Sequence, residues 1–175
     1  MRFVTYTGEK GAQRPGLLLE DGATVADLGH LYPSLLALID AGEDGLAAAR
    51  KEAQAPAKTL PLAGLRLLAP LPEPRQLRDC MVCEKHLKQA SEQGQKLTGV
   101  ESPKANIPPV WYAQPIYYKG NRFSVIGTET DIEWPAYAEL LDFELELALV
   151  IGRKGKDIAP EKAGDHIIGY MIFND

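Results

Sequence analysis

The chain has little cysteine, no long apolar run and no excess of positive charge, and each shortage excludes a class of protein. Two cysteines in 175 residues cannot build the disulfide framework of a small secreted domain. No apolar stretch approaches the roughly 18 residues that a membrane-spanning helix needs, and the first 13 residues contain no apolar core of the signal-peptide kind. A formal net charge of −5 argues against nucleic acid or an anionic membrane as the main partner. We therefore expect a soluble, cytoplasmic protein.

What is present is an ordinary globular composition, with 45% hydrophobic and 25% charged residues. In the first third, the pattern predicts a small α/β domain with short strands followed by two short helices within residues 33–55. Pro70, Pro72 and Pro74 then interrupt regular structure and mark a boundary region. We expect domains over residues 1–62 and 63–175, and the three strands of the first over residues 2–6, 16–20 and 23–28.

The second part is expected to contain more strands than helices, so the fold class is α+β and β-rich. A polar segment rich in helix formers predicts one helix over residues 84–97. A strand, a turn and a second strand are expected over residues 115–127, and a further strand begins at Leu141. The last segment, DHIIGYMIFND, is strand-like and ends at Asp175 without a polar tail. We expect the chain to be the front part of a longer one.

The segment LDFELELALVIG, residues 141–152, places Asp142, Glu144 and Glu146 at alternate positions with no basic residue between them. Alternation is the period of a β-strand, so the carboxylates are expected on one face and the leucines on the other. Same-face side chains on a strand lie about 6.6–7 Å apart, and like charges at that separation repel one another. This face is therefore either exposed to water, which is the common case, or occupied by a cation.

Two details of this segment favour the cation. The unbroken aliphatic side predicts that the strand enters a core, and no Lys or Arg stands on the carboxylate side to relieve the repulsion. Clustered carboxylate oxygens suit a hard cation such as Mg²⁺, Mn²⁺ or Ca²⁺ rather than zinc.

The segment DCMVCEKH, residues 79–86, admits several interpretations. A lone histidine in a polar helix is most often a surface residue. Cys80, Cys83 and His86 could form part of a zinc site, although the chain has no further cysteine to complete it, and the Cys-x-x-Cys pair does not begin a thioredoxin-like βαβ unit. In the remaining interpretation Asp79 is a metal-facing carboxylate at a strand end, and His86 is a base on the following helix.

Four motifs in this order resemble the fumarylacetoacetate hydrolase family. They are Asp79 with His86 seven residues later, P-x-x-Y-K-G-N-R-x-S-V-I-G at 115–127, LDFELELALVIG at 141–152 and GYMIFND at 169–175. The similarity covers about residues 65–175, and the order of the motifs makes the combination specific. The resemblance implies a mixed β-sandwich roll after the small N-terminal domain, and a homodimer.

The resemblance also implies which residues act. The catalytic histidine falls on His86, which activates water together with a glutamate. Some members keep that glutamate three residues after the histidine, where this chain has Gln89; other members supply it from a later part of the chain. The implied cation is Mg²⁺, Mn²⁺ or Ca²⁺, and its implied ligands are Glu144, Glu146, Asp175 and, in some members, Asp79.

The activity implied by the resemblance is metal-dependent hydrolysis of a C–C bond in β-dicarbonyl acids such as acylpyruvates, through a metal-stabilised enolate. Related members are decarboxylases, isomerases or sugar-acid dehydratases, and these stay open because Gln89 replaces the local glutamate. A catalytically inactive member that only binds a ligand is the alternative outside the enzymes. The expected partner is a small keto-acid substrate.

Overall fold

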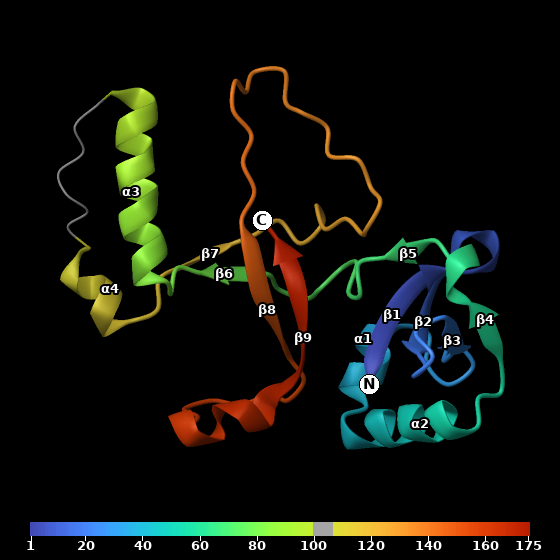
Figure 1. Ribbon diagram of the computed structural model, residues 1–175. Coiled ribbons are helices and arrows are strands. Elements are labelled where there is room, and N and C mark those ends of the chain that lie inside the picture. The colour runs from blue at the N-terminus through green and yellow to red at the C-terminus, as the bar shows by residue number, and fades with distance from the viewer. Residues whose placement is uncertain (100–106) are drawn as a thin grey trace. The chain divides into compact units, whose positions relative to one another are not determined.

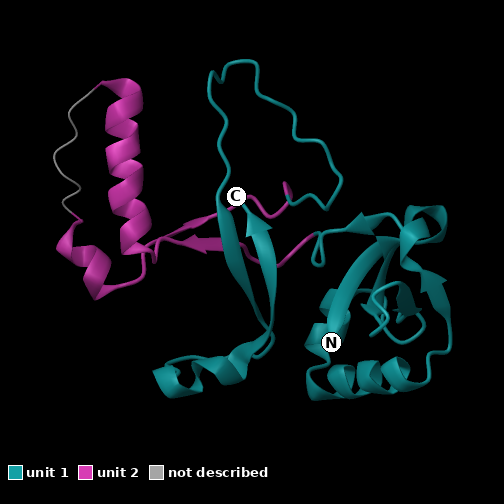
Figure 2. Ribbon diagram, in the orientation of Figure 1, with its two compact units in different colours: residues 1–72, 125–175 teal, residues 73–124 magenta. Residues whose placement is uncertain are grey.

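The computed structural model describes residues 1–99 and 107–175 (Figure 1). The contacts divide the chain into two units (Figure 2): unit 1 comprises residues 1–72 and 125–175, and unit 2 comprises residues 73–124. The expected domain boundary between residues 62 and 63 is not tested by this division and stays a prediction. Within the described residues, no helix has the length and apolar character needed to cross a membrane.

Unit 1 contains a five-stranded antiparallel sheet with the order β4-β3-β2-β1-β5. The three strands expected from the sequence are confirmed as its first three, although β2 begins and ends earlier than expected. The turn between β2 and β3 forms because Gly22 has a φ of 67° and the Asp21 carboxylate accepts hydrogen bonds from two backbone amides. The strands are β1 (Arg2–Thr7), β2 (Gln13–Leu18), β3 (Thr24–Asp27), β4 (Thr59–Pro61) and β5 (Leu67–Leu68).

The two expected helices are α1 (Leu35–Asp40) and α2 (Glu43–Gln54), and they cover the core of this sheet. The Ser34 hydroxyl caps α1 by accepting a hydrogen bond from the Ala37 amide at 3.1 Å. Single 3₁₀ turns, η1 (Glu9–Gly11) and η2 (Leu62–Gly64), lie in the connections. The buried core consists of Leu17, Ala26, Leu28, Leu35, Leu38, Ile39 and Ala49.

The rest of unit 1 is built on an antiparallel ribbon of β8 (Leu145–Ile151) and β9 (Ile167–Asn174), with the 3₁₀ segment η3 (Pro160–His166) between them. The final strand predicted from the sequence is confirmed as β9. The expected start at Leu141 is wrong, because β8 begins four residues later. The Asp142 carboxylate accepts a hydrogen bond from the next backbone amide at 2.8 Å, and such a local bond competes with strand pairing.

The two faces of this ribbon differ from the sequence expectation. Val150 and Ile168 pack against the N-terminal core, so the face that carries Glu146 is the one turned inward. The aliphatic face is open within the described residues: Leu145 is 73% exposed and Leu147 69% exposed. The strand therefore reaches a core as expected, but it does so through the side that carries Val150, and its leucine side is open among the described residues.

Unit 2 contains the two-stranded antiparallel sheet of β6 (Arg78–Cys80) and β7 (Tyr117–Lys119), and the helices α3 (Glu84–Thr98) and α4 (Pro109–Ala113). The expected helix over residues 84–97 is confirmed as α3. The second strand expected within residues 115–127 is wrong, because the Asn121 side chain accepts the Phe123 amide and turns the chain after β7. From the sequence we also expect a loop over residues 101–109, and its residues 101–106 lie outside the described residues.

Candidate metal centre

The open end of the β8–β9 ribbon brings two acidic side chains together. A carboxylate oxygen of Glu146 and one of Asp175 lie within 4.8 Å of each other. Their backbones are held by the register of the ribbon, in which Glu146 is opposite Phe173. The pairing continues one step beyond the strands, because Glu144 and Asp175 exchange two backbone hydrogen bonds of 2.8 and 2.9 Å. Asp175 is therefore fixed against the start of β8.

This spacing matches a shared cation. Hard cations bind carboxylate oxygens at about 2.0–2.6 Å, so two oxygens on opposite sides of one ion are separated by about 4–5 Å. Two unit charges 4.8 Å apart repel by about 0.9 kcal/mol in water and by about 3.5 kcal/mol at an effective dielectric constant of 20. Glu146 is half-buried and Asp175 is exposed, so the repulsion energy of the two carboxylates lies between these two values. An all-oxygen pair of this kind fits Mg²⁺, Mn²⁺ or Ca²⁺.

Glu144 lies outside this close pair. Its residue precedes the first residue of β8 and its side chain is exposed, so alternation along a strand does not fix where the carboxylate points. The sequence pattern treated Glu144 and Glu146 as equivalent, whereas the structure distinguishes them.

In unit 2, Asp79 occupies the middle position of β6, where it is half-buried and opposite Tyr118 of β7. Three residues connect β6 to α3, whose third residue is His86. His86 is exposed, as is Gln89 one turn later. The first turn of α3 also contains an ion pair between Glu84 and Lys88, which lowers the pKa of the Glu84 carboxyl through the hydrogen bond and the charge of Lys88.

The cysteines of this segment form no disulfide. Cys80 ends β6 and Cys83 precedes α3, and both are free and exposed. Neither is gathered with other ligand-type side chains among the described residues. The structure thus gives no support to the zinc interpretation.

One group of polar residues was missed by the sequence analysis. Arg75, Arg78, Lys119 and Arg122 line a common pocket in unit 2. In the sequence, each of two segments contains two basic residues three positions apart. This spacing indicates a shared site only when the register of β6 against β7 is known.

The chain is similar to known proteins over residues of both units. A model of the fumarylacetoacetate (FAA) hydrolase C-terminal domain matches residues 82–175, more than half of the chain. The chain belongs to the fumarylacetoacetate hydrolase family. The resemblance given by the four motifs is confirmed.

Among family relatives, a mitochondrial oxaloacetate tautomerase of Xenopus laevis is 30% identical over the whole chain, which covers 51% of that protein. The solved fumarylacetoacetate hydrolase of Exiguobacterium antarcticum is 26% identical, with a TM-score of 0.65, and the whole chain covers 55% of it. The chain spans about half the length of the relatives that it matches.

A further solved structure shows the same fold. It is a maleylpyruvate hydrolase of Sphingobium sp. SYK-6, described in complex with manganese(II) ion and pyruvate. It is 20% identical with a TM-score of 0.69, and the whole chain covers 58% of it. These likenesses confirm the β-rich α+β fold of the fumarylacetoacetate hydrolase type.

Proposed function

We propose that the protein is a divalent-metal-dependent hydrolase that cleaves a C–C bond in β-dicarbonyl acids such as acylpyruvates. The observation that carries the proposal is the close pair of Glu146 and Asp175 carboxylates at the end of the β8–β9 ribbon. Membership of the fumarylacetoacetate hydrolase family supports it, as does the manganese ion described for the maleylpyruvate hydrolase of the same fold.

In this proposal Glu146 and Asp175 hold the cation, and Glu144 and Asp79 are the further ligands that the family pattern implies. Glu144 is one residue before β8, its side chain is exposed, and its backbone is paired with that of Asp175. When bound, such a cation supplies Lewis-acid stabilisation of negative charge on the carbonyl oxygens of a substrate.

His86 is the proposed general base. A neutral imidazole nitrogen can accept a proton from water, and His86 is exposed in the first turn of α3. His86 takes a proton from water, the hydroxide oxygen bonds to the distal carbonyl carbon, and the adjacent C–C bond breaks. The departing fragment keeps the electron pair as an enolate and is then protonated at carbon, so the products are a carboxylic acid and a 2-oxo acid.

A tautomerase is the second candidate, and two observations favour it. The Xenopus laevis relative named as an oxaloacetate tautomerase is similar over the whole chain. Position 89 holds glutamine, whose amide cannot act as the basic partner of His86. Keto–enol exchange needs only proton transfer between carbon and oxygen, so it does not require an activated water. A decarboxylase, a sugar-acid dehydratase and an inactive binding protein stay open beside it.

The test is to incubate the chain with Mn²⁺ or Mg²⁺ and, separately, an acylpyruvate and oxaloacetate. Release of pyruvate and an acid from the acylpyruvate, lost in Glu146→Gln, supports the hydrolase. Faster enol–keto exchange of oxaloacetate without cleavage supports the tautomerase instead. Saturable Mn²⁺ binding with no turnover supports the inactive binding protein, and absence of Mn²⁺ binding overturns the proposed site itself.

Two other expectations stay predictions. The homodimer implied by the resemblance is checked by light scattering coupled to size-exclusion chromatography. The cytoplasmic location needs separate evidence, because several relatives are named as mitochondrial.

A further inference from the structure

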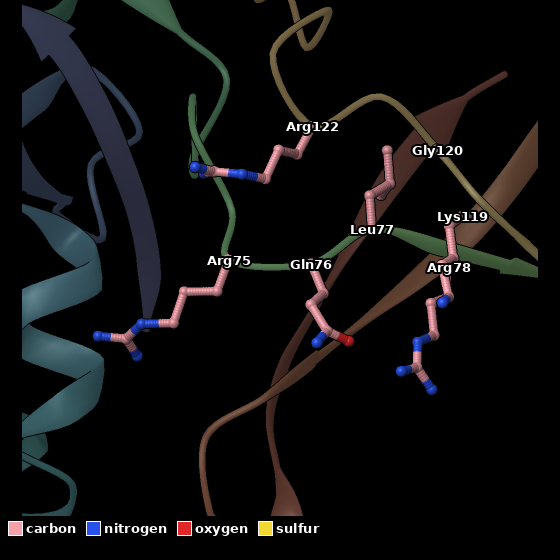
Figure 3. Close-up of a pocket in the computed structure, with 7 residues that line it drawn as sticks. All are labelled: Arg75, Gln76, Leu77, Arg78, Lys119, Gly120 and Arg122. Carbon is pink, nitrogen blue, oxygen red and sulfur yellow. The ribbon is translucent and has the colours of Figure 1, made fainter.

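Unit 2 contains a pocket of about 220 Å³ that is lined by two segments, one that leads into β6 and one that leaves β7 (Figure 3). No lining residue is acidic. The chain as a whole has a net charge of −5, so the positive charge of this pocket is opposite in sign to that of the chain. Four of the seven lining residues are cationic: Arg75, Arg78, Lys119 and Arg122.

The β6–β7 pairing brings the two segments together. Arg78 lies directly opposite Lys119 in the antiparallel register, and the Gly120 amide donates a hydrogen bond to the Leu77 carbonyl oxygen at 3.1 Å. A Cβ atom on residue 120 would lie 2.8 Å from a methyl carbon of Leu77, so glycine allows this close approach. Backbone pairing therefore brings Arg78 and Lys119 together, and Arg75 and Arg122 lie three residues away from them along the chain.

Two of the cations are also held by contacts of their own. The Arg122 Nη1 atom donates a hydrogen bond to the Pro74 carbonyl oxygen at 3.0 Å, and this residue is half-buried. The Arg78 guanidinium lies 4.7 Å from the centre of the Tyr117 ring. In Figure 3, Gln76, Arg78 and Lys119 project to one side of the chain and Leu77 to the other.

Without a ligand this arrangement is unfavourable, because like charges directly opposite each other on paired strands destabilise the pair. An anion between them reverses the sign of the interaction. Guanidinium groups bind carboxylate and phosphate oxygens through two parallel hydrogen bonds, and the amide of Gln76 adds neutral donors. We propose that this pocket is a binding site for a small dianion, either phosphate or a short dicarboxylate.

The pocket is separate from the proposed metal ligand of the same strand. Successive side chains of a strand point to opposite faces, so Arg78 and Lys119 lie on one face of the β6–β7 pair and Asp79 with Tyr118 on the other. The volume equals that of roughly seven water molecules, enough for phosphate or a dicarboxylate of a few carbons. The inference stands on unit 2 alone and does not rest on the proposed hydrolase function.

The experiment is an amide chemical-shift titration of the ¹⁵N-labelled 175-residue chain with sodium phosphate and, separately, sodium malonate. Ionic strength is kept constant with sodium chloride, and metal is removed from the protein and buffer with a chelating resin before the titration. We expect saturable shifts concentrated at residues 75–78 and 119–122. Lys119→Gln should weaken the affinity about tenfold, which corresponds to losing about 1.4 kcal/mol of binding free energy.

Lys96→Gln is the matched control, because Lys96 is an exposed lysine of α3 in the same unit and does not line the pocket. It should bind as the wild type does, and Arg75→Gln should weaken binding in the same direction as Lys119→Gln. If phosphate binds more tightly than malonate, the site is a phosphate site, and if malonate binds more tightly, it is a dicarboxylate site. Shifts that do not saturate, or that are the same in Lys119→Gln as in wild type, would overturn the site.

Discussion

Replacing Glu146 by glutamine should remove the response of the chain to a divalent cation while leaving the shape of the side chain nearly unchanged. The carboxylate oxygens of Glu146 and Asp175 lie within 4.8 Å, and their repulsion of about 0.9–3.5 kcal/mol is relieved when a cation binds between them. A ligand at 100 times its dissociation constant adds about 2.7 kcal/mol to the free energy of unfolding. For a chain of this length, that corresponds to a rise in Tm of about 5–11 °C.

The assay is a thermal melt followed by circular dichroism, with EDTA or with saturating Mn²⁺. Wild type should show the rise, and Glu146→Gln should show less than a third of it. Glu161→Gln is the matched control, since Glu161 is an exposed carboxylate of η3 in the same unit, and it should respond as the wild type does. An undiminished rise in Glu146→Gln would refute the assignment of this pair as a cation site, and an equal loss in Glu161→Gln would show a general charge effect.

Three further predictions concern other parts of the chain. Gly45→Ala should destabilise the protein by about 1–3 kcal/mol, because the new Cβ would lie 2.2 Å from a carbonyl oxygen of α1. Gly94→Ala should stabilise α3 by about 0.5–1 kcal/mol, because a Cβ there would have no atom within 4 Å. Urea melts of the two variants measure both changes. His86→Ala should keep the Mn²⁺-dependent rise in Tm and lose turnover, and loss of both would instead assign it a structural role. Burial raises the pKa of Asp27, but hydrogen bonds from Arg14 at 2.7 Å and from a backbone amide outweigh it and hold the pKa below its ordinary value. Stability from this pair is therefore complete above the unfolded-state pKa of about 3.9 and is lost as pH falls through the lower folded-state value. Asp27→Asn should be less stable at pH 7 and should lose less stability between pH 5 and pH 2, and an unchanged pH profile would contradict this assignment.

Local signals allowed much of the fold to be predicted. The Ser34 cap, the Gly22 turn and the strand period act over a few residues, so the first three strands and the two short helices follow from them. The strand position of Glu146 could be predicted from alternation among neighbouring residues, and the structure places it in β8; its role as a metal ligand is implied by the order of four motifs and stays a prediction.

The missed features depend on contacts between segments or on a single side-chain bond. Whether the leucines or Glu146 of β8 face inward is decided by Val150 and Ile168, which pack against a core formed more than 100 residues earlier. The late start of β8 results from the Asp142 side chain taking the next amide. The cationic pocket requires the register that places Arg78 opposite Lys119, which hydrophobic periodicity does not specify for such short strands.

The packing of Val150 and Ile168 on the N-terminal core has a consequence for the order of folding. That core is formed by residues 17–49, whose contacts are short in sequence and close quickly. The β8–β9 ribbon reaches this core only by closing a loop of about 100 residues, which costs more chain entropy and is slower. We therefore expect Val150→Ala to raise the unfolding rate and to leave the refolding rate nearly unchanged. The Glu146 and Asp175 carboxylates are brought together by the pairing of β8 with β9 alone, so a bound ion would report formation of the ribbon and not its later packing on the core.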